Sequence, residues 1–162
     1  MDEDQQVREL YERFPYPTPI ADVEPYVKRE RYLSWNPDTS WNLFFPDSPK
    51  RGDLDILVAG CGTRIGFMMA ASMPEATVTC VDISQASINH SEETSRRAGL
   101  TNIEHHLLPL ERVAELGKTF DFIHCHGVLH HLASPVAGLQ ALASVLRPEG
   151  AMSLMVYARY GR

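Results

Sequence analysis

A glycine-rich loop and a distant acid have the types and spacing that hold a nucleoside. Gly60-Cys61-Gly62-Thr63 follows an apolar run and opens a helical stretch. Glycines let the backbone approach a ligand closely, and free N–H groups at a helix start favour a carboxylate or a phosphate. Asp82 follows a second apolar run, 20 residues after Gly62, where an acid accepts hydrogen bonds from both hydroxyls of a ribose.

This pair predicts a nucleoside cofactor and does not choose among nicotinamide, flavin and S-adenosylmethionine. Asp82 also has a structural alternative, because an acid just before Ser84 suits the start of the helix that follows. The choice depends on the rest of the chain.

Four histidines gather around the end of another apolar run. His124 and His126 alternate along the predicted strand and therefore point to the same side, and His130 and His131 follow in the next turn. A metal site is conceivable, but no Cys or carboxylate spacing completes a recognised ligand set, so we predict no metal. Imidazole titrates near neutral pH, which makes His126 and His130 candidates for a general base.

An alternation of apolar runs and helical stretches must position these residues. Strands are predicted at residues 54–59, 77–81, 103–106, 120–125 and 151–157, and helices at 64–72, 84–98, 111–116 and 135–146. Gly99 suits a helix C-cap, Ser134-Pro135 suits a helix start, and Pro148-Glu149-Gly150 suits a turn. The pattern predicts an α/β fold with a doubly wound, mostly parallel sheet, which binds ligands at the carboxyl ends of its strands.

The first 52 residues are predicted to form a helical and extended arm that covers a core at residues 53–162. Val7, Leu10, Tyr11 and Phe14 have helical spacing, and the prolines from Pro15 onward force an extended course. The aromatic side chains of this arm either cover the sheet or form a lid. In the lid hypothesis Tyr11, Phe14 and Tyr16 exclude water from a bound ligand.

The composition limits the classes of function. A chain of 162 residues with 44% hydrophobic residues fits one domain with a sizeable core. Its net charge of −6 disfavours general nucleic-acid binding, which needs clustered Lys and Arg. The acidic start and the lack of a long apolar stretch predict no signal peptide, no membrane span and a cytoplasmic location. Cys61, Cys80 and Cys125 are expected to be buried, reduced thiols.

Four motifs follow one another with the spacing of a known enzyme family. They are Asp55-Ile56-Leu57-Val58-Ala59-Gly60-Cys61-Gly62-Thr63, Val81-Asp82-Ile83-Ser84, the segment from Phe120 to Leu132, and Leu146-Arg147-Pro148-Glu149-Gly150-Ala151. Together they resemble the motifs of class I, Rossmann-like S-adenosylmethionine-dependent methyltransferases. A nicotinamide dehydrogenase would also have a glycine loop and a distant acid, but the stretch Gly127-Val128-Leu129-His130-His131-Leu132 argues against that class of enzyme.

The resemblance implies a sheet in the order 3-2-1-4-5, S-adenosylmethionine as the cofactor and S-adenosylhomocysteine as its product. It also implies a site, in which Gly60, Cys61 and Gly62 pass under the methionine part and Asp82 holds the ribose. Ile83 is then expected to pack on the adenine, Leu108 to contact the cofactor, and His126 and Gly127 to line the methionine and substrate side. From their position just past the fifth strand, Tyr157, Arg159 and Tyr160 are expected on the acceptor side.

The sequence departs from the family pattern at three places, and the departures at Val58 and at Leu107-Leu108-Pro109 favour an alternative function. Val58 stands where the family often has an acid for the methionine amino group, and Arg64 stands at a frequent third glycine. Leu107-Leu108-Pro109 replaces an acid that contacts the adenine, with Glu111 as a weak substitute. The first hypothesis is a methyltransferase acting on an unidentified small molecule or protein. The alternative is an inactive, methyltransferase-like binding or assembly module.

The family's sheet has two more strands after the fifth, which this sequence lacks. The apolar stretch from Ala151 to Tyr157 is therefore expected to be an edge strand, which natural proteins usually cover. We predict that the full protein is longer, with a natural end at Arg162 as the alternative. We also expect the edge to pair with a second copy or with a neighbouring chain.

Overall fold

A computed structural model describes residues 3–28 and 36–158 of the chain. Tyr32, Trp35, Arg159 and Tyr160, which the sequence assigns to the arm or to the acceptor side, lie outside the described residues. All statements below concern the described part.

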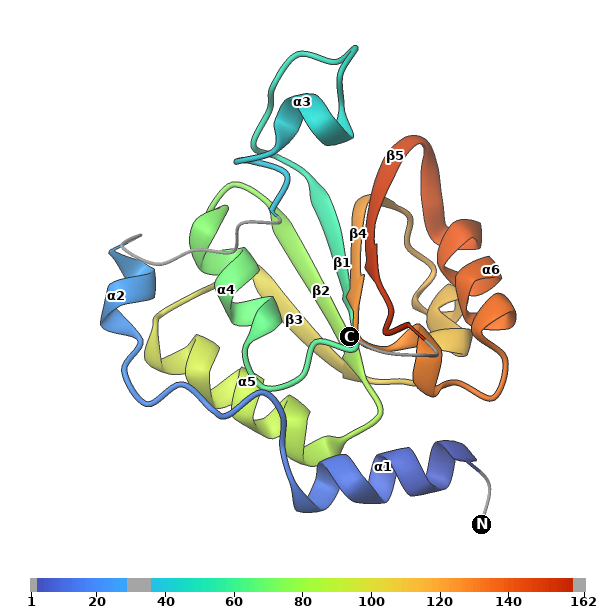
Figure 1. Cartoon of the computed structure of the whole chain (residues 1–162). Coiled ribbons are helices and arrows are strands. Elements are labelled where there is room, and N and C mark those ends of the chain that lie inside the picture. Colours follow the sequence, from blue (N-terminus) through green and yellow to red (C-terminus); the bar gives the residue numbers. More distant parts are fainter. Residues whose placement is uncertain (1–2, 29–35, 159–162) are drawn as a thin grey trace.

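The core is a five-stranded parallel sheet in the order β3-β2-β1-β4-β5 (Figure 1). Its strands are β1 (Asp55–Ala59), β2 (Thr77–Asp82), β3 (Ile103–Leu107), β4 (Phe120–His126) and β5 (Leu146–Met155). All four neighbouring pairs are parallel. The strand order reverses between β1 and β4, so their carboxyl ends form the crevice in which such sheets bind ligands. The predicted fold class and strand order are confirmed.

Helices cover both faces of the sheet (Figure 1). They are α1 (Glu3–Arg13), α2 (Glu24–Val27), α3 (Trp41–Phe44), α4 (Ile65–Ser72), α5 (Gln85–Arg97) and α6 (Pro135–Val145), with 3-10 turns η1 (Leu110–Leu116) and η2 (Leu129–His131). The Ser84 and Ser134 hydroxyls accept hydrogen bonds from the backbone N–H groups of Ser87 and Ala137 and cap α5 and α6. No described helix is long and apolar enough to cross a membrane.

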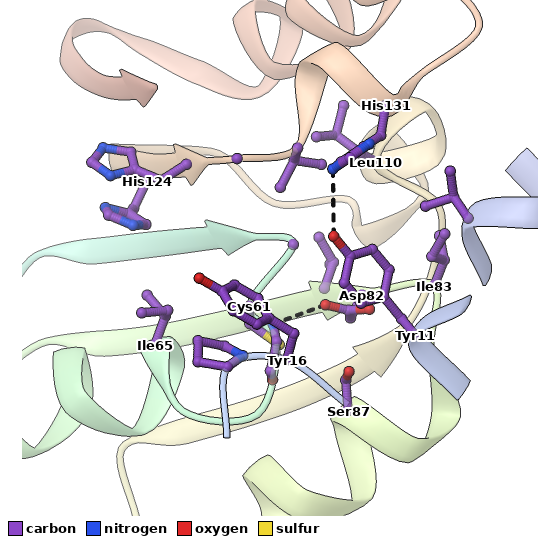
Figure 2. A pocket seen from close by; sticks show the side chains of 18 of the residues that line it. Tyr11, Tyr16, Cys61, Ile65, Asp82, Ile83, Ser87, Leu110, His124 and His131 are labelled. Atoms are coloured by element: carbon purple, nitrogen blue, oxygen red, sulfur yellow. Dashed lines mark hydrogen bonds between the residues drawn. The ribbon is translucent and has the colours of Figure 1, made fainter. Parts of the chain in front are cut away.

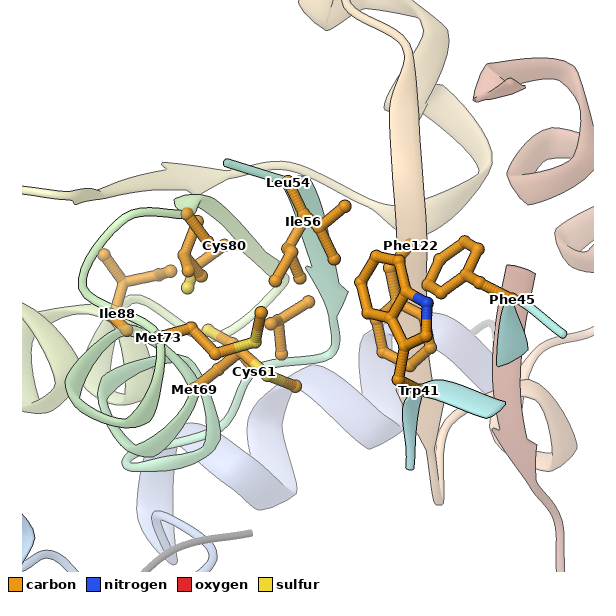
Figure 3. Close-up of a cluster of buried hydrophobic side chains, with 14 residues drawn as sticks. Trp41, Phe45, Leu54, Ile56, Cys61, Met69, Met73, Cys80, Ile88 and Phe122 are labelled. Atoms are coloured by element: carbon orange, nitrogen blue, oxygen red, sulfur yellow. The ribbon is translucent and has the colours of Figure 1, made fainter. Parts of the chain in front are cut away.

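Alternate residues of β1 face two separate hydrophobic clusters, as the period of two requires. Ile56 and Val58 pack against α3, α4 and α5, whereas Leu57 and Ala59 pack against η1, η2 and α6. In the first cluster Trp41 and Phe45 lie beside Phe122 (Figure 3). The arm segment that contains α3 therefore completes the core.

The amino ends of β1, β4 and β5 are joined by an ion cluster around Asp121. Its carboxylate accepts hydrogen bonds from the backbone N–H of Asp55 (2.9 Å) and from Arg147 (2.6 Å), and it pairs with Arg51 (2.8 Å). Burial opposes ionisation, but these donors outweigh it and hold the pKa of Asp121 below its usual value. Arg147 also bonds to Asp55, so the cluster fixes β5 to the rest of the sheet.

Two predicted elements differ from the structure. The turn predicted at Pro148-Glu149-Gly150 is wrong, because these residues lie inside β5, which begins directly after α6. A bulge between Phe120 and Phe122 accommodates the irregular register, and an edge strand tolerates a proline that cannot donate. The helix predicted at residues 111–116 is a 3-10 helix, ended by Gly117 in the left-handed conformation.

The packing of α4 on β2 depends on the absence of a side chain at Gly66. A Cβ at this position would lie 2.1 Å from Cys80 Sγ. Overpacking costs roughly 1–3 kcal/mol, and a helical Gly-to-Ala exchange returns about 1 kcal/mol. We therefore expect Gly66→Ala to lower the free energy of unfolding by up to about 2 kcal/mol, measured by urea denaturation.

Cys80→Ala in the same chain provides the control for this prediction. Removing the sulfur leaves room for the new methyl group, so the double variant should be more stable than the sum of the two single changes allows. Additive effects of the two substitutions would contradict the packing account.

Candidate functional site

A cavity of about 320 Å³ opens at the carboxyl ends of β1, β2 and β4 (Figure 2). Its volume lies in the range of small-molecule sites. Residues of the sheet, of the loops that follow the strands and of the N-terminal arm line it: Val7, Tyr11, Tyr16, Pro17, Gly60, Cys61, Gly62, Arg64, Ile65, Val81, Asp82, Ile83, Ser87, Leu108, Leu110, His124, His126, Gly127, Val128, His131, Leu132, Met155 and Tyr157.

The loop between β1 and α4 requires its two glycines. Gly60 and Gly62 have φ values of +69° and +54°, in the left-handed region that favours glycine. A Cβ on Gly60 would lie 2.2 Å from Val128 Cγ2, and one on Gly62 would lie 2.5 Å from the Tyr16 carbonyl oxygen. The loop is thus pressed between the arm and the segment after β4, with its backbone at the cavity wall.

Asp82 fixes this loop at the end of β2. Its Oδ2 accepts a hydrogen bond from the Gly62 N–H (2.8 Å), and its Oδ1 accepts one from the Ser84 N–H (2.9 Å). Burial raises the pKa of Asp82, and the backbone donors oppose this rise. The carboxylate lies at the cavity wall and retains further lone pairs, which suit two vicinal hydroxyl groups.

The arm docks over the cavity through contacts from α1 and from the segment after it. The Glu12 carboxylate accepts hydrogen bonds from the Gln85 N–H (2.5 Å) and the Ala86 N–H (3.3 Å), at the positive end of α5. The Thr63 hydroxyl donates to the Pro17 carbonyl oxygen. These contacts bring arm residues to the cavity on both sides of Asp82.

Of the three aromatic residues expected to form a lid, two line the cavity and one does not. The Tyr11 hydroxyl lies 3.4 Å from His131 Nε2, and its ring stands between His131 and Asp82 (Figure 2). Burial, followed by the nearby Asp82 charge, raises the pKa of Tyr11. Tyr16 also lines the cavity. Phe14 is 60% exposed and lies outside the lining.

The histidines form two pairs with adjacent rings, a stacked pair of His124 with His126 and a tilted pair of His130 with His131. The rings of His124 and His126 are 3.9 Å apart, and those of His130 and His131 are 4.1 Å apart. His126 Nε2 lies 2.8 Å from the Ser153 hydroxyl. Burial lowers the pKa of all four, so the imidazoles are neutral near pH 7. His126 lines the cavity, whereas His130 stands behind it against Tyr157, at 4.7 Å between ring centroids.

Most of the site residues expected from the sequence meet at this one cavity. Gly60, Cys61, Gly62, Asp82, Ile83, Leu108, His126, Gly127, Tyr11, Tyr16 and Tyr157 line it, and Phe14 and His130 do not. Sequence reasoning missed Ser87 and Met155 as lining residues. Ser87 lies in the first turn of α5, and Met155 is the last residue of β5. Ligands of such sheets bind at the ends of the strands and the starts of the helices that follow, so this rule could have predicted both residues.

The pKa values of the Cys61 and Cys125 thiols are raised, so these two side chains stay protonated near pH 7. Cys61, Cys80 and Cys125 are free and buried. The adjacent Cys80 thiol and burial raise the pKa of Cys61, and burial raises that of Cys125 to about 12. Among the residues that the structure describes, no group of three or more His, Cys, Asp and Glu side chains is arranged to hold a metal ion.

The cavity fits an adenosyl amino acid by the chemistry of its walls. Asp82 suits the ribose, the apolar Ile83 and Leu108 suit the adenine, and the glycine loop leaves space for an extended chain. His124 Nδ1 is buried in the wall without a hydrogen-bond partner. A buried polar atom of this kind is satisfied by a bound ligand or a water.

Comparison with known proteins agrees with this geometry. Residues 57–152 match the family described as "Methyltransferase domain". The chain is 38% identical over 161 residues to an uncharacterized protein of Synechococcus sp., covering 98% of this chain and 38% of that protein. It is 33% identical over 109 residues to the ubiquinone biosynthesis O-methyltransferase of Parvibaculum lavamentivorans, covering 66% of this chain and 42% of the relative.

A solved structure extends the comparison to the cofactor. PKMT2 from Rickettsia typhi, solved in complex with S-adenosylhomocysteine, matches with a TM-score of 0.59 and 28% identity over 65% of this chain and 21% of that one. The chain spans about 40% of the length of the two curated relatives. By family match, strand order and cavity, this chain belongs to the methyltransferase-domain family, whose cofactor is S-adenosylmethionine.

Proposed function

We propose that this chain binds S-adenosylmethionine in the cavity and takes part in the transfer of its methyl group to an acceptor. The observation that carries the proposal is the position of Asp82, which holds the glycine loop and lies in the same cavity as the arm and the histidines. Gly60, Gly62 and Asp82 hold the donor, and the acceptor enters beside His126 and Tyr157.

When bound, the cofactor supplies an electrophilic methyl group on a sulfonium. The chain's own contribution is alignment and exclusion of water, because in-line displacement depends on the approach geometry of the nucleophile. Tyr11 and Tyr16 cover the cavity from the arm side. The neutral His126, held by Ser153 at 2.8 Å, accepts a proton when the nucleophile is a hydroxyl or another weak acid.

The walls on this side of the cavity support a proposal for the class of acceptor. Val128, Leu132, Met155 and Tyr157 carry no charge and lie beside the neutral histidines. This lining supports an uncharged group on a small molecule or a protein as the acceptor, rather than a polyanion. The related O-methyltransferase of ubiquinone biosynthesis has a name consistent with a hydroxyl acceptor.

The alternative function is an inactive module that binds the cofactor or assembles with other chains. Two features of the sequence favour this alternative. Val58 stands where the family often has an acidic residue, and Leu107-Leu108-Pro109 stands where the family commonly has a second acidic residue. Binding of S-adenosylhomocysteine without transfer of labelled methyl groups to any fraction of a cell extract would support the module.

Replacing Asp82 tests the cofactor site directly. Asp82→Ala and Asp82→Asn remove the carboxylate that is proposed to accept hydrogen bonds from the ribose. Each variant should therefore bind S-adenosylhomocysteine with an affinity at least tenfold lower, about 1.4 kcal/mol, in calorimetric titration. Asp47→Ala, an exposed acid in a turn, is the matched control and should bind normally. Equal affinity of the Asp82 variants and the wild type, or tighter binding of NAD, would contradict the assignment.

Removing the Glu12 contact tests the arm as a lid. Without the carboxylate, α1 loses its bonds to the start of α5, a kind of contact worth about 0.5–2 kcal/mol. Glu12→Ala should therefore speed tryptic cleavage after Arg13 and raise the dissociation rate of S-adenosylhomocysteine several-fold. Glu9→Ala, on the same helix, serves as the control, and identical behaviour of the two variants would refute the lid.

The outer edge of β5 is a proposed site of self-association. Leu154 of β5 is 40% exposed, and β5 is the last strand of the described sheet, where an unpaired strand edge pairs readily with another strand. Sedimentation equilibrium should give a reversible dimer, and Leu154→Lys should weaken it by placing a charge at the edge. A monomer at all concentrations would rule out this pairing.

A further inference from the structure

A row of four aromatic rings connects the arm with the segment just past β5. The Tyr11 ring meets His131 edge to face, with 6.1 Å between the ring centroids. The His131 ring lies 4.1 Å from that of His130, which lies 4.7 Å from that of Tyr157. Tyr11, His131 and Tyr157 line the cavity, so rings from α1, η2 and the segment past β5 form part of its wall.

A further tyrosine of the arm joins this ring row. Tyr16 lines the cavity, and Figure 2 shows it reaching in from the arm, as Tyr11 does. Burial, followed by the Asp82 charge, raises the pKa of Tyr11. The hydroxyl groups of Tyr157 and Tyr16 lie near enough to Tyr11 to add to this rise. Three tyrosine side chains therefore gather around one part of the cavity.

Two of these tyrosines are exposed although they belong to the cavity lining. Tyr16 is 63% exposed and Tyr157 is 50% exposed, which places both at the mouth of the cavity. A tyrosine ring packs well against another ring, offset or edge to face, at centroid distances of about 4.5–7 Å. The mouth of the cavity therefore offers ring surface on which a planar aromatic ligand can pack.

The ring row carries no charge near pH 7. The pKa of the Tyr11 phenol is raised, and burial lowers the pKa of His131. Arg64 and Asp82 are the only Asp, Glu, Lys or Arg residues among the described residues that line the cavity, and neither belongs to the row. A charged acceptor packed on the row would lose hydration without gaining an ion pair there. The row therefore favours an uncharged ring.

The proton acceptor in the cavity favours a hydroxyl group of high acidity. His126 lines the cavity, with its Nε2 at 2.8 Å from the Ser153 hydroxyl. Burial lowers the pKa of His126, which makes its ring a weaker base than an ordinary histidine. A phenol has a pKa of about 10, several units below that of water, which an aliphatic alcohol resembles. A weak base therefore takes the proton of a phenol far more readily.

We propose that the acceptor is an uncharged aromatic hydroxyl compound whose ring packs among Tyr11, Tyr16 and Tyr157 at the mouth of the cavity. In the transfer, the acceptor oxygen forms a bond to the methyl carbon while the bond between methyl and sulfur breaks, and the sulfur keeps that electron pair. The hydroxyl proton passes to His126. The inference rests on the proposed function, because it names the class of acceptor for the same site.

Four probes test the class of acceptor by calorimetric titration into the complex of the chain with S-adenosylhomocysteine, which requires no turnover. 2-Naphthol is the aromatic hydroxyl compound, and trans-decahydro-2-naphthol is its saturated counterpart. N-acetyl-L-tyrosinamide presents the same hydroxyl group as a protein side chain does. N-acetyl-L-lysinamide carries an ammonium group, which tyrosine rings can also attract.

The ring row predicts a distinct pattern of affinity. The wild-type complex should bind 2-naphthol about tenfold more tightly than its saturated counterpart, and Tyr16→Leu and Tyr157→Leu should each lower this ratio about threefold. Tyr157→Phe keeps the ring and should keep the ratio. Phe14→Leu, which alters an exposed arm ring outside the cavity lining, is the matched control. Retained binding of S-adenosylhomocysteine shows that each variant is folded.

Methyl transfer should follow the same preference. With S-adenosylmethionine as the donor, 2-naphthol should yield its methyl ether, detected by mass spectrometry, and the saturated counterpart should not react. Methylation of N-acetyl-L-tyrosinamide in preference to 2-naphthol would also support an aromatic hydroxyl group and would identify a protein as its source.

The inference and the proposed function fail in distinguishable ways. If S-adenosylhomocysteine binds but the complex prefers the saturated or the lysine probe, or if the tyrosine variants leave the ratio unchanged, the acceptor is not recognised by these rings and the proposed function stands. Binding of 2-naphthol without formation of its methyl ether would also overturn the inference. If S-adenosylhomocysteine does not bind to the wild type, the proposed function fails as well.

Discussion

The carboxylate of Asp82 joins the backbone segments from which the site is built. It accepts from Gly62 in the loop after β1 and from Ser84 at the start of α5, while the N–H groups of Gly60 and Cys61 bond to the Val81 carbonyl oxygen. The ends of β1 and β2 therefore cannot separate without exposing unpaired buried groups. The structural and the ligand-binding interpretations of Asp82 are compatible, because one carboxylate has enough lone pairs for both.

The arm and the histidines lie around the joined ends of β1 and β2. The glycine loop lies close enough to Tyr16 that a side chain on Gly62 would collide with its carbonyl oxygen, so the arm crosses directly above the loop. Glu12 holds the same arm to α5, the helix that Ser84 caps. On the other side, β4 carries neutral imidazoles into the wall. The cavity is thereby enclosed by the arm on one side and by uncharged imidazoles on the other.

The sequence predicted the fold well because apolar runs of strand length alternate with capped helices, and such alternation has few topological solutions. It misplaced the start of β5, since Pro148 and Gly150 mark a turn locally but sit in an edge strand here. Gly60, Gly62 and Asp82 were predicted from their types and spacing, and all three line the cavity. The lack of a hydrogen bond at His124 Nδ1 and at Arg64 Nε was not predicted, because it depends on tertiary neighbours that no local pattern records.

The most direct measurement of the central claim is a crystal structure of the chain grown with saturating S-adenosylhomocysteine. The account predicts the ribose hydroxyls within about 3 Å of the Asp82 carboxylate. It also places the adenine against Ile83 and the amino acid end above the glycine loop. A ligand bound elsewhere, or in this cavity with the ribose away from Asp82, would contradict the account.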